Sequence, residues 1–549
     1  MTGSKRTTVG KYLTKRLEQV GLKHVFGVPG DYVLQFFEDL GKSNIDVIGT
    51  CNELNAGYAA DAYARVNGVG CACVTYGVGG FSLLNAIVGS FAERLPVIAI
   101  SGSPNTGERS HRHLLHHTIG DMDLQYRIYE EITVASCVLT SPEKAPKQID
   151  ETLKACLRYK RPVYIELPVD VVSRPCCAPG PFSIDERIAS DRAALKEAVA
   201  ESSWLLSRAK SPVILAGIEA HRLKIRGQLQ GLVDHTGYPF ATSLLGKTVL
   251  PEKHPQFIGT YGGAMSTGPA RDLIESADIV LSIGALMTDL NLGIWSAHLD
   301  PSKMITANSD NVRIKHHIYK HVSLRDFISA LRGKLKKKRI RLPKFRHPSQ
   351  AVKKRFVPAS GRKITHKRFF QRMNHLIDKK SIVIADTGDS ILSAFDLYLP
   401  EDVLFLDQAF YLSIGYSVPA TLGAKLAAPK RRPITFVGDG AFQMTAQELG
   451  TIIRNGLNPI IFLMNNDGYT IERYLHDGPF NDLQRWNYHK LPEAFGGGWG
   501  SRVTTEGELE AALEKTARRP KEAALIEVML EKMDCSDHLK RLGRIVHKK

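Results

Sequence analysis

Short runs rich in β-branched residues alternate along the chain with longer amphipathic segments, and this alternation restricts the possible folds more than any other feature. Several runs are apolar along their whole length, which is typical of strands covered on both faces of a parallel sheet. Segments with helical spacing, such as 82–94 and 445–456, lie between them. The pattern predicts doubly wound α/β units. The expected strands lie in residues 97–102, 162–168, 211–217, 278–285, 381–388, 433–440 and 459–466.

Two breaks divide the pattern into three units. The chain has 549 residues, which at roughly 150 residues per domain suggests three or four domains. Residues 174–190 are rich in proline and small residues, and a basic segment follows near 332–362. We therefore expect an α/β protein of three domains, each a mostly parallel, doubly wound sheet flanked by helices. The expected domains are residues 1–180, 190–340 and 360–549.

The positive charge is concentrated in one segment. The chain has 73 Lys and Arg against 56 Asp and Glu, a formal net charge of +17. Sixteen of these basic residues and no acidic residue lie between Arg332 and Arg368, which leaves 57 basic against 56 acidic residues elsewhere. We interpret the segment as an exposed linker. The alternative is a patch for an anionic partner such as nucleic acid, for which charge alone supports only weak, salt-sensitive binding.

Composition excludes several other classes of protein. Hydrophobic residues make up 43% of the chain and charged residues 23%, which is ordinary for a globular protein and excludes a disordered chain. No stretch approaches the roughly 18 consecutive apolar residues of a membrane helix. The first ten residues lack the apolar region of a secretory signal, so we expect a cytoplasmic protein. Its eight cysteines are sparse, and we expect Cys71, Cys73, Cys176 and Cys177 to be buried apolar residues.

Residues 438–472 contain the most informative motif. One apolar strand ends in Gly438-Asp439-Gly440, and the next ends in 465–468, Asn-Asn-Asp-Gly. Asp439, Asn466 and the main-chain carbonyl of Gly468 could supply the oxygen ligands that Mg²⁺ prefers. The helix expected to begin near Ala441 offers free N–H groups to a phosphate. A simple turn is the alternative, but two such sequences at neighbouring strand ends favour a diphosphate and metal loop.

This segment resembles the thiamine-diphosphate motif, and the whole chain resembles the pyruvate, indolepyruvate and branched-chain 2-oxo-acid decarboxylases. The resemblance implies an N-terminal pyrimidine-binding domain, a middle domain and a C-terminal diphosphate-binding domain. It also implies thiamine diphosphate and Mg²⁺ as cofactors, and release of CO₂ and an aldehyde from a 2-oxo acid. The supporting segments are 26–32, 51–65, 75–82, 116–121, 243–250, 386–390 and 413–420.

The resemblance assigns catalysis to Glu53, Asp31, His116, His117 and Glu472. It places Glu53 against the aminopyrimidine ring of the cofactor, where it favours the imino tautomer; a plain helix-start carboxylate is the alternative. It places the other four residues in the reaction cleft, where histidines suit proton transfer near neutral pH. Asp31 could instead be a helix N-cap. Adjacent histidines in an extended segment point in opposite directions, so we expect this pair not to chelate one metal.

The resemblance also assigns the contacts to the cofactor, with Ile414 as the bulky side chain that bends it. Three residues depart from the family pattern: Leu412 replaces a common glycine, Ala441 a common serine and Val33 a common asparagine. The expected cofactor-binding residues are Glu53, Thr387, Asp389, Ser413, Ile414, Gly438, Asp439, Gly440, Ala441, Asn466, Gly468, Tyr469, Thr470 and Ile471.

The resemblance implies that the substrate pocket is lined by Thr387, Ile391, Ile471 and Leu542. Ile391 stands where some pyruvate-specific relatives carry tryptophan, which indicates room for larger aliphatic or aromatic side chains. The preferred acid stays open, because one methylene changes selectivity by only about 1–3 kcal/mol. A carboligase similar to acetolactate synthase is an alternative, and a non-catalytic anion-binding protein is another. The resemblance further implies active sites between subunits of a homodimer or homotetramer.

Overall fold

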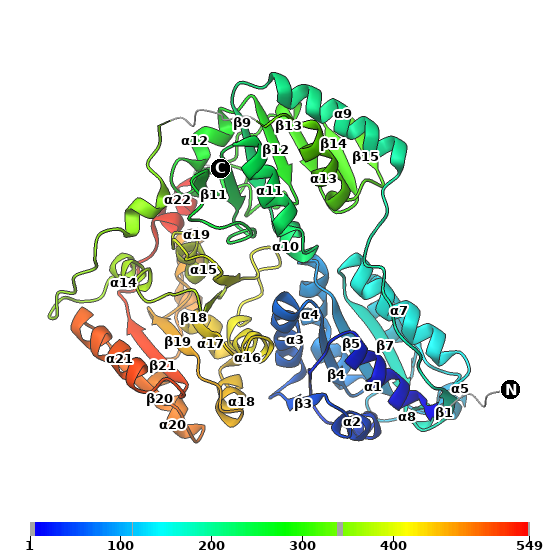
Figure 1. Cartoon of the computed structure of the whole chain (residues 1–549). Helices are drawn as coiled ribbons and strands as arrows, with labels where there is room; N and C mark the ends of the chain where they lie inside the picture. Colours follow the sequence, from blue (N-terminus) through cyan, green and yellow to red (C-terminus); the bar gives the residue numbers. More distant parts are fainter. Residues whose placement is uncertain (1–5, 112, 338–343, 547–549) are drawn as a thin grey trace.

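Three α/β sheets with flanking helices make up the chain (Figure 1), so the predicted fold class is confirmed. The structure is a computed structural model and describes residues 6–111, 113–337 and 344–546. Each of the seven apolar runs expected to be a strand overlaps one. No helix in the described residues has both the length and the apolar character needed to cross a membrane.

The N-terminal sheet has six strands, all parallel, in the order β3-β2-β4-β5-β7-β6. Its central strands are buried throughout, as expected for a sheet covered on both faces. The strands are β2 (His24–Gly27), β3 (Asp46–Gly49), β4 (Gly70–Val74), β5 (Val97–Ser103), β6 (Ser136–Val138) and β7 (Val163–Pro168). The helices are α1 (Val9–Gln19), α2 (Leu34–Gly41), α3 (Glu53–Asn67), α4 (Val78–Ala92), α5 (Thr106–His111), α6 (Leu124–Glu131), α7 (Ala145–Tyr159) and α8 (Val169–Val172).

The middle sheet has seven strands in the order β11-β10-β9-β12-β13-β14-β15. The first five are parallel to one another, and β14 and β15 each pair antiparallel with the strand before them. Its strands are β9 (Pro212–Ala216), β10 (Phe240–Ser243), β11 (Phe257–Tyr261), β12 (Ile279–Ile283), β13 (Met304–Ala307), β14 (Asn311–Ile314) and β15 (His317–Lys320). Its α-helices are α9 (Arg192–Arg208), α10 (Glu219–Arg222), α11 (Arg226–Thr236), α12 (Ala270–Glu275) and α13 (Leu324–Lys334).

The C-terminal sheet has six parallel strands in the order β17-β16-β18-β19-β21-β20. Its strands are β16 (Ser381–Ala385), β17 (Leu404–Leu406), β18 (Arg432–Gly438), β19 (Ile460–Asn465), β20 (Trp499–Val503) and β21 (Ala524–Met529). Its α-helices are α14 (His366–Met373), α15 (Asp389–Ala394), α16 (Ser417–Ala427), α17 (Asp439–Thr445), α18 (Glu448–Arg454), α19 (Thr470–Leu475), α20 (Leu491–Ala494), α21 (Glu506–Arg518) and α22 (Asp537–Val546).

Both predicted linkers contain more structure than expected. Part of the first is strand β8 (Pro175–Cys177), which pairs antiparallel with β1 (Arg6–Thr8). All described cysteines are free, and Cys71, Cys73 and Cys176 are buried as expected, but Cys177 is exposed because it sits on this two-stranded edge. The second linker includes a 3₁₀ turn at Pro348–Val352, and part of it, residues 338–343, lies outside the described residues. The domain boundaries stay predictions.

The N-terminal and C-terminal domains meet through helices α3 and α16, which lie side by side in Figure 1. The contact is close because α16 carries Gly423 where the two backbones approach. A Cβ atom at this position would lie 1.9 Å from the carbonyl oxygen of Ala59 on α3. Any larger residue at this position would clash with α3, so the packing of the two helices requires glycine.

Replacing Gly423 by alanine should destabilise the protein by about 1–3 kcal/mol, because the added methyl group forces the two helices apart. Thermal unfolding followed by circular dichroism measures the effect. The control is Gly333→Ala on α13, where a Cβ meets nothing within 4 Å. That change should stabilise by about 0.5–1 kcal/mol through the higher helix propensity of alanine, and equal effects of the two changes would contradict the argument.

Candidate active site

A cavity of about 380 Å³ lies at the carboxyl ends of β16, β18 and β19, the edge at which ligands bind to doubly wound sheets. All the residues expected to bind the cofactor line it except Glu53 and Ser413, and so do all those expected to form the substrate pocket. The predicted residues in its wall are Thr387, Asp389, Ile391, Ile414, Gly438, Asp439, Gly440, Ala441, Asn466, Gly468, Tyr469, Thr470, Ile471, Glu472 and Leu542.

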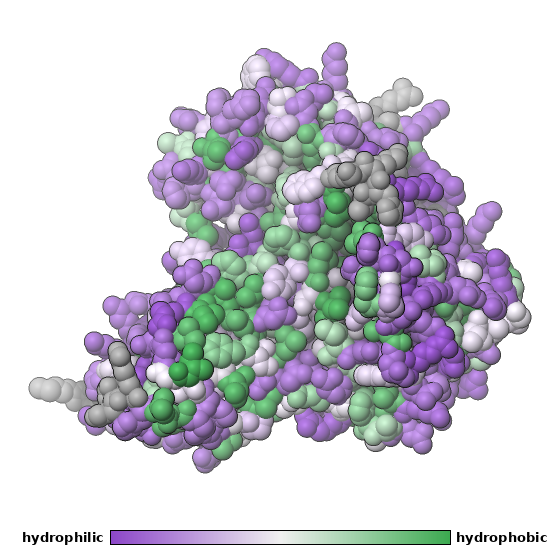
Figure 2. Space-filling model, turned by 180° about the vertical axis from the view of Figure 1, so that it is seen from behind, coloured by the Kyte–Doolittle hydropathy of each residue, from purple (hydrophilic) through white to green (hydrophobic). Residues whose placement is uncertain are grey.

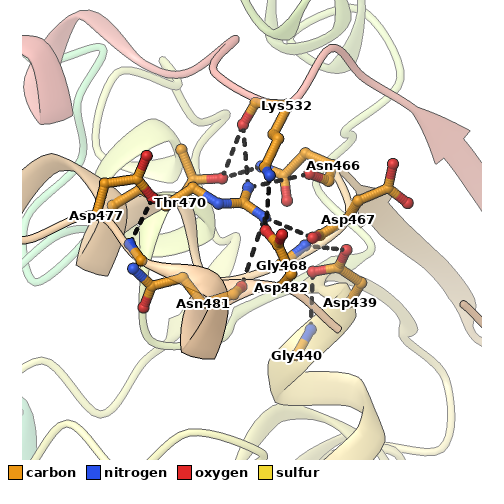
Figure 3. Close-up of polar contacts among 12 residues, drawn as sticks. Asp439, Gly440, Asn466, Asp467, Gly468, Thr470, Asp477, Asn481, Asp482 and Lys532 are labelled. Carbon is orange, nitrogen blue, oxygen red and sulfur yellow. Dashed lines mark hydrogen bonds and ion pairs between the residues drawn. The ribbon is translucent and has the colours of Figure 1, made fainter. Parts of the chain in front are cut away.

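Asp439 is the buried acid of the predicted metal site. It follows β18 directly and begins α17. Its carboxylate accepts hydrogen bonds from the N–H of Gly440 at 2.8 Å and the N–H of Gly468 at 3.0 Å (Figure 3). Burial raises the pKa of Asp439 to about 6, although these N–H groups act in the opposite direction. A divalent cation would relieve this unfavourable burial of negative charge.

The loop after β19 brings the other expected metal ligands next to Asp439 (Figure 3). The side-chain amide of Asn466 donates to the hydroxyl of Thr470 at 2.5 Å. Arg473 donates to the carbonyl of Asn466 at 3.2 Å and to the carboxylate of Asp482 at 2.7 Å, and so ties the loop to the segment that follows. Asp439, Asn466 and Gly468 are therefore adjacent, as the motif predicts.

The loop after β16 contributes two acids that have quite different surroundings. Asp386 is fully buried and accepts from the N–H groups of Gly415 at 3.0 Å and Ser417 at 2.8 Å. Burial raises the pKa of Asp386 to about 6. The hydroxyl of Thr387, which lines the cavity, is buried without a hydrogen-bond partner in the described structure. Such an orphaned polar group indicates that a ligand belongs in the cavity.

Asp389 is engaged within the chain. Its carboxylate lies 3.0 Å from Nε2 of His366 and accepts from the N–H of Ser536 at 2.8 Å and from the Ser536 hydroxyl. Burial raises the pKa of Asp389, but His366 and Ser536 outweigh it and hold this pKa below its usual value. These contacts anchor the start of α22, which carries Leu542 into the cavity wall.

The segment at 412–414 begins with a residue in a backbone conformation that favours glycine. Leu412 has a φ of +58°, a left-handed conformation that costs a leucine roughly 1–2 kcal/mol. Its side chain and that of Ile414 line the cavity. Ser413 is among the residues expected to bind the cofactor. Its hydroxyl shares a 2.5 Å hydrogen bond with Tyr58 and accepts from Asn85 at 3.2 Å.

The two other residues that depart from the family pattern, Ala441 and Val33, are both buried. Ala441 is buried and lines the cavity, so it offers the diphosphate no hydroxyl. Val33 is buried in the N-terminal core and precedes α2 without a side-chain cap. Because Val33 occupies the N-cap position, Asp31 is not the cap of this helix.

Asp31, His116 and His117 form a separate cluster in the N-terminal domain. Nε2 of His116 lies 2.5 Å from the Asp31 carboxylate, and Nε2 of His117 lies 3.8 Å from it. Partial burial raises the pKa of Asp31, but the hydrogen bond with His116 and the charge of His117 outweigh it, and this pKa lies below its usual value. The expectation that the histidines point in opposite directions is wrong, because His117 has a φ of +63° and is not extended.

Glu53 begins α3 and is half-buried. The turn that carries it is fixed from the C-terminal domain by Glu448, which accepts from the N–H of Cys51 at 3.1 Å and the side chain of Asn55 at 2.7 Å. Among the described residues that line the cavity, none comes from the N-terminal domain. Of the predicted catalytic residues, one chain therefore brings only Glu472 to the cavity, and the other four lie on the N-terminal domain.

Sequence reasoning missed several residues of the site. Leu290 and Ile294 reach the cavity from the middle domain, and His366, Leu475 and Leu530 reach it from the C-terminal domain. The four apolar residues carry no motif, because apolar side chains become part of a wall only through the tertiary fold. His366, Glu448 and Glu93 were missed because their polar partners lie far from them along the chain. Glu93 accepts from the N–H groups of Phe410 and Tyr411, just before Leu412.

Comparisons with known proteins agree with this geometry. Three family models match the chain: "Thiamine pyrophosphate enzyme, N-terminal TPP binding domain" at residues 7–125, the central domain at 199–332 and the C-terminal TPP binding domain at 386–528. A probable pyruvate decarboxylase of Schizosaccharomyces pombe is 37% identical, over 98% of this chain and 96% of its own length. Pyruvate decarboxylase 4 of Arabidopsis thaliana is 38% identical, over 99% and 92%. Pyruvate decarboxylase 1 of Oryza sativa is 37% identical, over 99% and 92%.

The raised pKa of Asp386 makes stability depend on pH. The folded state binds this proton more tightly than the unfolded state, so the stabilisation is present below about pH 4 and is lost as pH rises through about 6. The shift of about two pKa units corresponds to about 3 kcal/mol. Asparagine does not titrate, so the unfolding free energy of the wild type relative to Asp386→Asn should fall by up to about 3 kcal/mol between those pH values.

Urea unfolding at the two pH values measures this difference. Asp272→Asn, at an exposed position on α12, controls for the substitution itself. A difference between the wild type and Asp386→Asn that stays constant with pH would contradict the predicted linkage.

Proposed function

The chain belongs to the family of thiamine-diphosphate-dependent 2-oxo-acid decarboxylases, and from this membership we propose that it releases CO₂ and an aldehyde from a 2-oxo acid. The cavity at the carboxyl ends of β16, β18 and β19 carries the proposal. It gathers almost all the residues expected to bind cofactor and substrate, although they come from loops far apart in the sequence.

The residues of this cavity fit thiamine diphosphate with Mg²⁺. Asp439, Asn466 and the carbonyl of Gly468 would hold the cation, which prefers oxygen ligands. The unpartnered Thr387 hydroxyl offers a hydrogen bond, and Ile414 presents an apolar side chain to the same space. When bound, the cofactor supplies the electron sink for decarboxylation.

Proton handling falls to the residues near the substrate. Asp31 and His116 already share a short contact and His117 lies beside them, so a proton can pass within this group. Glu472 is exposed at the rim of the cavity, where it can act on a bound substrate. Glu53 would hold the aminopyrimidine ring in its reactive form.

We propose that two chains complete each active site, in a homodimer or a homotetramer. Asp31, Glu53, His116 and His117 do not line the cavity of their own chain, so a second copy must supply them. The surface opposite to the face in Figure 1 has a broad apolar area (Figure 2). Large apolar side chains are exposed on the N-terminal domain, at Leu34, Val78 and Phe81, and on the C-terminal domain, at Met444. A second copy would bury such side chains.

We propose that the cavity accepts 2-oxo acids with side chains larger than that of pyruvate. Leu290, Ile294, Ile391, Leu475 and Leu542 are aliphatic, and Tyr469 is the only Phe, Tyr or Trp among the described residues that line it. Flexible aliphatic walls leave room for branched or aromatic groups and still admit a smaller acid. Pyruvate therefore remains within the proposed range.

Aldehyde release from a panel of 2-oxo acids, with thiamine diphosphate and Mg²⁺, tests the proposed function. Glu53→Gln should lower the rate by about 100-fold or more, whereas Glu131→Gln, at an exposed position ending α6, should not.

Co-expression of the Glu53→Gln chain with an Asp439→Asn chain tests the shared site. About half of the dimers should be mixed and each mixed dimer has one intact site of two, so about a quarter of the activity should return. Acetolactate in place of aldehyde would overturn the reaction, and no restoration in mixed dimers would overturn the shared site.

Narrowing the cavity should change substrate choice. Ile391→Trp should lower kcat/KM for phenylpyruvate relative to pyruvate by about 10-fold to 200-fold, the range that small changes of pocket volume produce. Because Ile391 is buried, thermal unfolding must show that the variant folds. Leu542→Phe offers a second test from another wall, and an unchanged ratio in both folded variants would contradict the assignment of the pocket.

A further inference from the structure

Asp31, His116 and His117 present three possible metal ligands to one point. One carboxylate oxygen and one ring nitrogen from each histidine all lie within 4.8 Å of one another. Two imidazoles and a carboxylate form a ligand set that suits divalent transition metals such as Zn²⁺, Ni²⁺ and Cu²⁺. This set differs in kind from the all-oxygen group of Asp439, Asn466 and Gly468, which suits Mg²⁺.

The structure holds these side chains in place. The ring of Tyr32 stacks on that of His116, with ring centres 4.9 Å apart and planes 12° apart. The left-handed backbone of His117 turns its ring to the same side, and this depends on Gly77. A Cβ atom on Gly77 would lie 1.8 Å from the carbonyl oxygen of His117. A metal therefore meets two imidazole rings that the packing already orients, which lowers the entropic cost of binding.

The three ligand atoms need only small movements to bind one ion. The Nε2 atoms of His116 and His117 lie 2.5 Å and 3.8 Å from carboxylate oxygens of Asp31. A tetrahedral Zn²⁺ with bonds of about 2.0–2.1 Å places its ligand atoms about 3.3 Å apart. Each side chain has to move by less than about 1 Å, a change that rotations of exposed side chains supply. In the single chain the side chains of Asp31, His116 and His117 are 49%, 60% and 32% exposed. In the proposed dimer they face the cavity that the substrate must enter, so an ion can reach them.

We propose that Asp31, His116 and His117 bind a divalent transition-metal ion such as Zn²⁺, and that this ion inhibits the enzyme. The ion takes one lone pair from each imidazole and one from the carboxylate, so the atoms that face it no longer exchange the protons of the reaction. The inhibition rests on the proposed decarboxylase function, whereas the binding does not. Mg²⁺ does not compete, because imidazole is a poor ligand for it.

Binding of a metal ion to Asp31, His116 and His117 can be measured with Co²⁺ as the probe. The full-length protein is treated with a chelator, loaded with thiamine diphosphate and excess Mg²⁺, and titrated with Co²⁺ while its visible absorption is recorded. A saturable band that Zn²⁺ removes is expected. Asp31→Asn, His116→Gln and His117→Gln should each weaken binding by at least about tenfold, since even the loss of an outer contact commonly costs that much. The control is His317→Gln, which changes an exposed histidine that lies 3.0 Å from Glu201 on the middle domain.

The outcomes separate the two parts of the proposal. Binding that is unchanged in folded His116→Gln and His117→Gln proteins, checked by circular dichroism, would overturn the metal site. Zn²⁺ should also reduce aldehyde release over the concentration range in which it displaces Co²⁺. Full activity with the site occupied would overturn the inhibition alone. A holoenzyme that releases no aldehyde even without Zn²⁺ would contradict the proposed function, and the cobalt titration would still decide the metal site.

Discussion

Buried carboxylates that accept hydrogen bonds from backbone N–H groups fix the positions of the loops that form the site. Asp386 binds the loop that carries Ile414, Glu93 binds the residues just before Leu412, Glu448 binds the turn that carries Glu53, and Asp439 bridges the two glycine loops. Each acid receives at least two donors, as a buried carboxylate requires. Loops have few apolar contacts to fix them, so hydrogen bonds to buried charges set their geometry. Glu93 and Glu448 also cross between domains, which makes the loop positions depend on how the N-terminal and C-terminal domains meet.

Parallel strands explain why Asp439 and Asn466 could be placed together from the sequence, whereas the other cavity residues were assigned by the family resemblance. The carboxyl ends of neighbouring parallel strands share an edge, so the polar residues after β16, β18 and β19 must lie together. The run of apolar strands predicted the sheets, and the position of Asp439 and Asn466 after two of them predicted their adjacency. This part of the site follows from local sequence and from one rule of topology, and the structure places those residues as expected.

Contacts set by tertiary packing could not be predicted in this way. The partners of Asp389 lie on α14 and before α22, so nothing near it in sequence shows that its carboxylate holds a helix. Ser413 lies next to Ile414, yet its hydroxyl turns to Tyr58 in another domain. The histidine pair was misjudged because an extended backbone was assumed, whereas the left-handed φ of His117 depends on the absence of a side chain at Gly77. Each case requires knowledge of a neighbour distant along the chain.

Leu412 shows how the site accommodates a residue that local conformational preference disfavours. Its left-handed backbone would suit glycine, and a leucine adopts it at a cost of roughly 1–2 kcal/mol. Burial of a leucine side chain contributes about 1.5–3 kcal/mol when complete, and Leu412 is half-buried beside the apolar core of the C-terminal domain. Packing therefore offsets much of the strain. The backbone follows the path set by Glu93 and Asp386 on either side of it, while the side chain adds apolar surface to the cavity, so at this position the hydrogen bonds set the conformation and the side chain adapts to it.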